Sequence, residues 1–285
     1  MADTLGSGLA ALSTPVTVLI EKIAGAVGVL YEPKRIVRKA AAEAAAAQIT
    51  AFSNLEISDI QARTLQRIMY AESRKQENIE KITAQAVATL PNDAKPETLN
   101  EDWVTNFFNK CENVSDEEMQ SLWANLLSGE ATHPGTYSKR TVELVSMLDK
   151  NDAELFTRFC QFVWLFGTKP TPIVFNYRDE IFATAGMTLT SLWHLDDIGL
   201  INFDINSTYK KQGSGKKWML TYFGRRTIIE FPSDSGNEIF YGNVSFTTVG
   251  AELWNVSGAT PNWDFYHHIV TDWHNRGLIT SSFIG

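Results

Sequence analysis

The first 150 residues repeat apolar side chains at helical spacing. A short amphipathic helix is predicted over 14–32, where Pro15 suits the first helical position. A longer stretch, 55–90, is apolar at both ends and polar across its middle, 72–78. A helix of this kind often bridges two packed regions or pairs with a second copy of itself. We therefore predict one long helix over 55–90 and interpret it as an oligomer seam.

Beyond this helix the pattern stays helical and then changes near residue 170. Ser115 and Glu118 have the spacing of a capping box, which predicts a helix start there. Further on, the runs 200–205 and 217–220 read as strands, and the Gly-rich stretch 213–215 would join them into a hairpin. Two short helices precede these runs, so the order is typical of a winged helix-turn-helix.

These patterns predict a chain that is mainly α in its N-terminal half and α+β, winged-helix-like, in its C-terminal domain. The length of 285 residues allows two compact units, or one unit with a helical arm. In chain order, we expect an amphipathic, basic helical arm over 1–53, a long connecting helix over 54–92, a helical domain over 97–168 and the α+β domain over 170–285.

Composition narrows the class of protein. The net charge is −8 and both halves of the chain are acidic, so any contact with phosphate must come from a local patch. The chain has no uninterrupted run of about 20 apolar residues and no basic region of a signal peptide at its start. The two cysteines, Cys111 and Cys160, cannot form a disulfide framework. We expect a cytoplasmic protein.

A basic cluster directly follows the first helix and consists of Lys34, Arg35, Arg38 and Lys39. The apolar face of the helix could lie in a membrane interface while this cluster meets anionic lipid, each charge contributing about 1 kcal/mol. This interpretation places the protein peripherally at the inner membrane face. The alternative is that the apolar stripe packs against the protein itself, as most such stripes do.

A second basic cluster surrounds the expected hairpin and consists of Lys210, Lys211, Lys216, Lys217, Arg225 and Arg226. No acidic residue occurs from 209 to 226, so this hairpin could bind nucleic acid through its phosphates. The helix that would enter the major groove, 188–198, has no Lys or Arg and contains Asp196 and Asp197. We therefore favour a domain that contacts protein, with nucleic-acid binding as the alternative.

Residues for catalysis are sparse. His267, His268, Asp272 and His274 lie close together, and two of them share a helix face, yet no third metal ligand is placed by the sequence. Neither cysteine has a neighbouring histidine. We predict no catalytic residue, no metal site and no cofactor.

One dense motif lies within residues 101–160. Its members are Trp103, Trp123, Leu127, Gly129, Glu130, Pro134, Gly135 and Arg140. The motif resembles the bacterial family called domain of unknown function 2806, and the resemblance spans roughly residues 20–165. Physically these residues read as packing, with a Glu130–Arg140 pair bracing the turn at Pro134.

The segment 123–127 and the N-terminal arm are also loosely similar to abortive-infection alpha-type proteins of phage defence. This resemblance implies a biological setting and carries over no catalytic residue. The expectation is a non-enzymatic bacterial protein that self-associates and contacts a partner protein or the membrane surface. The alternatives are a nucleic-acid-binding accessory or regulatory protein and a metal hydrolase that uses 267–274.

Overall fold

The computed structural model describes residues 13–28, 59–213 and 215–283. The chain divides into two compact units, Met1–Ser146 and Met147–Gly285, and each is considered by itself. The four segments expected from the sequence are finer than this division and stay predictions. The first basic cluster, 34–39, lies outside the described residues.

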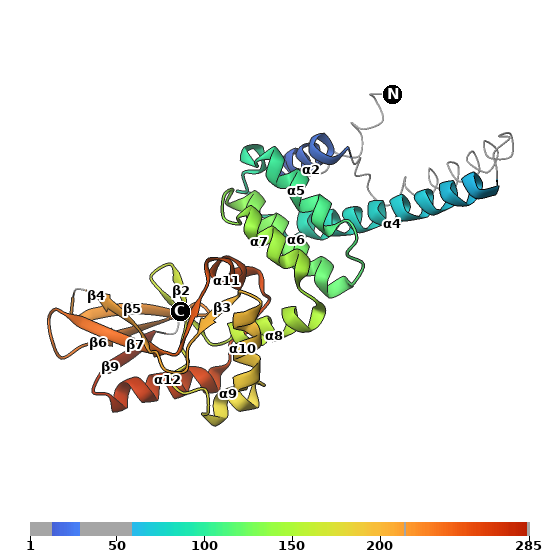
Figure 1. The fold of residues 1–285 in the computed structure, drawn as a ribbon. Coiled ribbons are helices and arrows are strands. Elements are labelled where there is room, and N and C mark those ends of the chain that lie inside the picture. The colour runs from blue at the N-terminus through green and yellow to red at the C-terminus, as the bar shows by residue number, and fades with distance from the viewer. Residues whose placement is uncertain (1–12, 29–58, 214, 284–285) are drawn as a thin grey trace. The chain divides into compact units, whose positions relative to one another are not determined.

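The first unit is helical (Figure 1). Its elements are α2 (Thr14–Val27), α4 (Asp59–Thr89), the 3-10 turn η1 (Pro96–Thr98), α5 (Glu101–Cys111), α6 (Glu117–Thr132) and α7 (Lys139–Met147). Asp116 caps α6 by accepting the amides of Glu118 and Met119, so the cap lies one residue after the predicted Ser115. Its core is aromatic, and the ring of Phe107 lies 5.1 Å from that of Trp123.

Helix α4 confirms the long helix predicted over 55–90, and its two halves differ. The buried residues all lie in the C-terminal half, which packs against α6: they are Asn78, Ile79, Ile82, Thr83 and Ala86. In the N-terminal half Ile60, Ile68 and Tyr70 are 67%, 47% and 66% exposed. Burial against α6 therefore stabilises only part of the helix, and the rest presents apolar side chains at the surface.

The second unit is α+β with antiparallel sheets. Its helices are α8 (Lys150–Cys160), α9 (Glu180–Thr184), α10 (Leu189–Asp197), α11 (Thr248–Leu253), the 3-10 turn η2 (Trp254–Val256) and α12 (Trp263–Asn275). The strands of the main sheet, in spatial order, are β2 (Lys169–Pro172), β1 (Val163–Phe166), β5 (Lys217–Tyr222), β6 (Arg225–Glu230) and β9 (Ile279–Phe283). Two ribbons pair β3 (Ile201–Phe203) with β8 (Val244–Phe246) and β4 (Tyr209–Gly213) with β7 (Asn237–Gly242).

Helix α12 covers one face of the main sheet. The ring of Trp164 on β1 stacks on Tyr266 at 5.3 Å and meets Trp273 edge-on at 5.0 Å. The hydroxyls of Thr227 and Tyr266 are 2.9 Å apart, which joins β6 to the same helix. Large aromatic side chains thus form the core between the helix and the sheet.

The hairpin predicted from the runs 200–205 and 217–220 is wrong. Strand β3 pairs with β8, whereas β5 pairs with β1 and β6, so these two runs lie in different sheets. Gly213 ends β4 and Lys217 begins β5, so the chain changes sheets between these two residues. A Cβ on Gly213 would lie 2.6 Å from the ring of Trp218. The α+β class holds for this unit, and the winged-helix assignment is not confirmed.

Among the described helices, none is both long and apolar enough to cross a membrane.

Candidate binding groove

A groove forms in the second unit where the end of α8 meets the chain entering α12. Asn262 caps α12, its Oδ1 accepting the amide of Phe265 at 3.0 Å. Thr157 of α8 donates its hydroxyl to the carbonyl of Ser257 at 2.7 Å. Residues about 100 positions apart in the sequence are therefore held together at this point.

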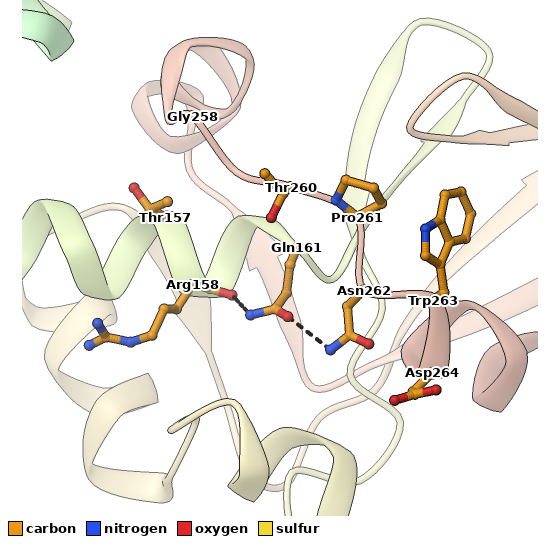
Figure 2. Close-up of a pocket in the computed structure, with 9 residues that line it drawn as sticks. All are labelled: Thr157, Arg158, Gln161, Gly258, Thr260, Pro261, Asn262, Trp263 and Asp264. Atoms are coloured by element: carbon orange, nitrogen blue, oxygen red, sulfur yellow. Dashed lines mark hydrogen bonds between the residues drawn. The ribbon is translucent and has the colours of Figure 1, made fainter.

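The Tyr222 hydroxyl fixes the floor of the groove. This oxygen lies 2.8 Å from the Gln161 carbonyl and 3.1 Å from the Asn262 carbonyl, and it accepts the Asn262 amide at 2.8 Å. Burial raises the pKa of Tyr222, so the hydroxyl stays protonated and keeps its proton for one of the carbonyls. The two amide side chains are also joined, with Asn262 Nδ2 donating to Gln161 Oε1 at 2.9 Å (Figure 2).

Two adjoining hollows of about 480 and 620 Å³ make up the groove. They share Arg158, Gln161, Asn262 and Asp264, which we call the groove residues. The first hollow extends along 258–263, and the second extends toward α9. The two hollows meet at these four polar residues, and apolar side chains such as Ile181 and Pro261 also line them.

The groove presents charges of both signs and one aromatic side chain. Arg158 has an exposed guanidinium, 3.7 Å from Glu154, and Asp264 carries an exposed carboxylate. Trp263 is 42% exposed, and the guanidinium of Arg225 lies 4.6 Å from its ring centroid. This set offers hydrogen bonds, two opposite charges and a flat apolar surface, which are the contacts used in molecular recognition.

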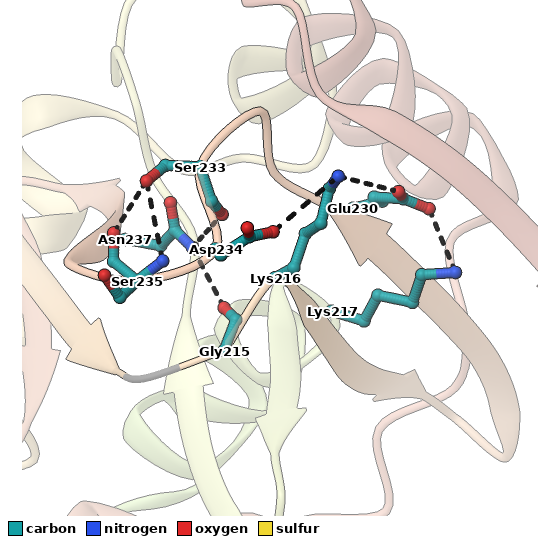
Figure 3. Close-up of polar contacts among 8 residues, drawn as sticks. All are labelled: Gly215, Lys216, Lys217, Glu230, Ser233, Asp234, Ser235 and Asn237. Atoms are coloured by element: carbon teal, nitrogen blue, oxygen red, sulfur yellow. Dashed lines mark hydrogen bonds and ion pairs between the residues drawn. The ribbon is translucent and has the colours of Figure 1, made fainter.

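Three of the six residues of the second basic cluster pair with acidic side chains, and Figure 3 shows two of them, Lys216 and Lys217. Lys217 Nζ lies 3.1 Å from Glu230, and Lys216 Nζ lies 3.7 Å from Glu230 and 3.8 Å from Asp234. Strand β7 supplies the partner of Lys210, whose Nζ is 2.8 Å from a Glu238 oxygen. Carboxylates that are distant in the sequence therefore offset much of the positive charge.

The remaining members of this cluster are Lys211 on β4 and the adjacent Arg225 and Arg226 on β6. Lys211 donates to the Phe166 carbonyl at 3.4 Å, and its pKa is lowered first by burial and then by Lys169. Arg226 is exposed on β6, near the turn of the β5–β6 hairpin, whereas Lys217 lies at the far end of that hairpin. The six residues thus do not share one hairpin tip, and contact with nucleic acid stays a prediction.

His268 and Asp272 of the histidine cluster each pair with a different residue outside the cluster. His268 Nε2 lies 3.5 Å from Asp179, and Asp272 lies 2.6 Å from the Nε of Arg276. Within the described residues, no three His, Cys, Asp or Glu side chains are grouped to hold a metal ion. Cys111 and Cys160 are buried, and burial raises the pKa of both thiols.

The family motif surrounds Tyr137 in the helical unit. The Glu130 carboxylate accepts the amides of Gly135 at 2.6 Å and Tyr137 at 2.8 Å. Trp103 Nε1 donates to the Tyr137 carbonyl at 2.8 Å, and a Cβ on Gly129 would lie 2.8 Å from the Tyr137 hydroxyl oxygen.

The predicted brace between Glu130 and Arg140 therefore has a different form. Glu130 does hold the turn that contains Pro134, but through backbone amides, because Gly135 (φ +88°) and Tyr137 point their N–H groups at its carboxylate. Arg140 is exposed on α7, while Trp123 and Leu127 are fully buried.

Sequence reasoning missed all four groove residues. A local signal was present in Pro261-Asn262, a combination that suits a helix start, but it gives no hint of α8. The sequence also did not show that Tyr137 is the centre of the motif's packing, because this role depends on the close approach of Gly129.

The chain thus consists of a helical unit and an antiparallel α+β unit that carries the groove. The family model described as "Protein of unknown function (DUF2806)" matches residues 62–270, so the chain belongs to this family. Searches of curated proteins and of solved structures each found no match.

The matched region differs from the span expected from the sequence. It begins at residue 62 rather than near 20, and it continues past 165 to include all the groove residues. Nothing in the comparisons supports the looser similarity to abortive-infection proteins.

Proposed function

We propose that this protein is a non-enzymatic binding protein whose groove receives an extended segment of a partner protein. The observation that carries the proposal is the groove floor, where one buried hydroxyl, that of Tyr222, holds Gln161 and Asn262 in place before any ligand arrives. A preorganised surface loses less conformational entropy on binding, which favours affinity.

The mixture of charges in the groove favours a peptide over a nucleic acid. Asp264 would repel a phosphate backbone, and Glu154 already offsets part of the charge of Arg158. A peptide presents amides and carbonyls of its own, which amide and hydroxyl side chains match in both directions. Trp263 adds the kind of exposed aromatic anchor that often dominates protein interfaces.

A photo-crosslinking amino acid at position 263 in cells tests this proposal. Position 193 is the matched control, because Trp193 is 50% exposed in the same unit but lies outside the groove lining. We expect a protease-sensitive adduct from position 263 alone, and its loss when Arg158 and Asp264 are exchanged as Arg158→Asp with Asp264→Arg. A nuclease-sensitive adduct, or equal adducts from both positions, would contradict the proposal.

Self-association through α4 is the second part of the proposal. The exposed Ile60, Ile68 and Tyr70 support the interpretation of this helix as an oligomer seam. We expect Ile60→Glu with Ile68→Glu to lower the mass of the assembly in sedimentation experiments. The exposed Met147→Glu, outside α4, is the control and should leave the mass unchanged.

The biological setting that we propose is phage defence, which rests only on the sequence similarity of 123–127 and the N-terminal arm. Phage plating on cells with and without the gene tests it, and equal plaque counts across diverse phages would contradict it.

Attachment to the membrane through 34–39 is tested by flotation with anionic vesicles. The matched variant there replaces all four basic residues by Glu, and we expect it to lose binding.

A further inference from the structure

Strand β9 forms one edge of the main sheet. Within the described residues it pairs with β6 alone, through a regular register from Glu230 opposite Ile279 to Arg226 opposite Phe283. Its other side presents backbone N–H and C=O groups, which is the arrangement that accepts an added strand. We infer that β9 pairs antiparallel with β9 of a second copy, so that one sheet continues across two chains.

The two edges of the sheet differ in how they resist pairing. Strand β2 at the opposite edge contains Lys169, Pro170 and Pro172, and both prolines and edge lysines block the addition of strands. Strand β9 has the sequence Ile-Thr-Ser-Ser-Phe, with no charge and no proline, and its register with β6 has no bulge. One pairing edge and one blocked edge favour a closed two-fold dimer and disfavour an open filament.

The hydrogen-bond pattern identifies which residues of β9 face outward. The Phe231 amide donates to the Lys216 carbonyl, so along β6 the residues 226, 228 and 230 direct their backbone groups toward β9. Ile279 and Ser281 are opposite two of these, and their backbone groups are used within the sheet. Those of Thr280 and Ser282 therefore face the free edge.

This alternation suits pairing between identical strands. A two-fold axis at Ser281 places Thr280 opposite Ser282 of the second copy, where the outward groups of both strands exchange about four hydrogen bonds. No like charges meet, because β9 carries none. The partner that this edge fits is therefore an uncharged strand identical to β9.

On the face of the sheet opposite α12, the surface beside this edge mixes apolar and charged side chains. Ile279 is 65% exposed and Met219, on β5 on the same face, is 56% exposed. Ile228 lies between β5 and β9 in the same row as Met219. Ile279 itself lies in the row of Glu230 and Lys217, which pair with each other, and a second copy at the β9 edge would remove Ile279 from water.

The test is sedimentation of the full-length chain, comparing Thr280→Pro with Met219→Lys. Proline at position 280 removes an outward N–H without removing a β6–β9 hydrogen bond, and we expect the dissociation constant of the assembly to rise about tenfold or more. Met219→Lys puts a charge on the same face but away from the edge, and the assembly should be unchanged. Ile279→Lys, which puts the charge at the edge, should weaken it.

Three outcomes would overturn the inference. One is a wild-type assembly that Thr280→Pro and Ile279→Lys both leave intact. Another is a chain made monomeric by the α4 variant Ile60→Glu with Ile68→Glu, since β9 pairing does not involve α4. The third is loss of assembly in Thr280→Pro accompanied by unfolding, while the folded Ile279→Lys chain assembles normally. Binding in the groove is measured by crosslinking and β9 pairing by sedimentation. One of the two proposals can therefore be contradicted while the other stands.

Discussion

The two units of this chain bring their polar side chains together over very different distances along the sequence. In the helical unit Glu130 bonds the amide of Tyr137, seven residues later, and the whole motif lies between Trp103 and Arg140. In the α+β unit Asn262 bonds Gln161 across 101 residues. The dense motif therefore marks a packed turn, whereas the groove for which we propose binding lies in a unit without such a local motif.

The two units therefore respond differently to substitution. The motif residues Trp123 and Leu127 are buried and Gly129 lies close to the Tyr137 ring, so their substitution would report on folding. The groove residues are at the surface, so their substitution should change binding while the fold persists.

The largest effect is expected from Gly242→Ala in the α+β unit. Gly242 has φ +101°, and an added Cβ would lie 1.7 Å from the Val174 carbonyl oxygen, a backbone atom. We expect a loss of more than about 4 kcal/mol in unfolding free energy, measured by denaturant titration. Gly258→Ala is the control: its φ is also positive but its Cβ meets open space, so a loss near 1 kcal/mol is expected. Equal losses would show that the contact with Val174 is unimportant.

In the helical unit we expect Gly129→Ala to cost about 1–3 kcal/mol, because the Cβ would press on the buried ring of Tyr137. Gly25→Ala, within α2 and facing open space, should stabilise by about 0.5–1 kcal/mol. Thermal unfolding followed by circular dichroism separates the two. A neutral Gly129→Ala would mean that Tyr137 moves aside and does not anchor the motif.

Tyr222→Phe tests whether the groove is preorganised. Without the hydroxyl, the Gln161 and Asn262 carbonyls lose a donor, and we expect a loss of about 1–2 kcal/mol in stability. Binding of the crosslinked partner should weaken about tenfold, a larger effect than Tyr241→Phe, whose ring is half-buried on β7. If Tyr222→Phe bound the partner with unchanged affinity, the preorganised groove would not be the site of partner binding.

The smallest effect is expected from Lys216→Ala with Lys217→Ala in a gel shift against duplex DNA. Glu230 and Asp234 already pair with these lysines, so any weak binding at low salt should change less than tenfold. The exposed Arg226→Ala is the comparison and should change it at least as much. A strong, salt-sensitive shift abolished by the lysine variant would restore the nucleic-acid alternative.

How much of the fold could be predicted depends on how far apart in the sequence the interacting residues lie. The helix predicted over 55–90 is present as Asp59–Thr89, because a helix is stabilised by neighbours three and four residues away. The helix start at Ser115 was one residue off, since Asp116 offered an equally good cap. The hairpin failed because a strand finds its partner through packing with distant segments, and those were β1, β6 and β8.

The sequence by itself determined the helical first half, the α+β character of the second and the motif that places the chain in its family. These properties depend on local periodicity, capping and composition, which can be read from residues that are close in the sequence. Only the tertiary structure decided which strands pair, that acidic side chains offset the basic cluster, and that α8 and α12 form a groove. Each of these depends on free energies of packing between residues that become neighbours only after folding.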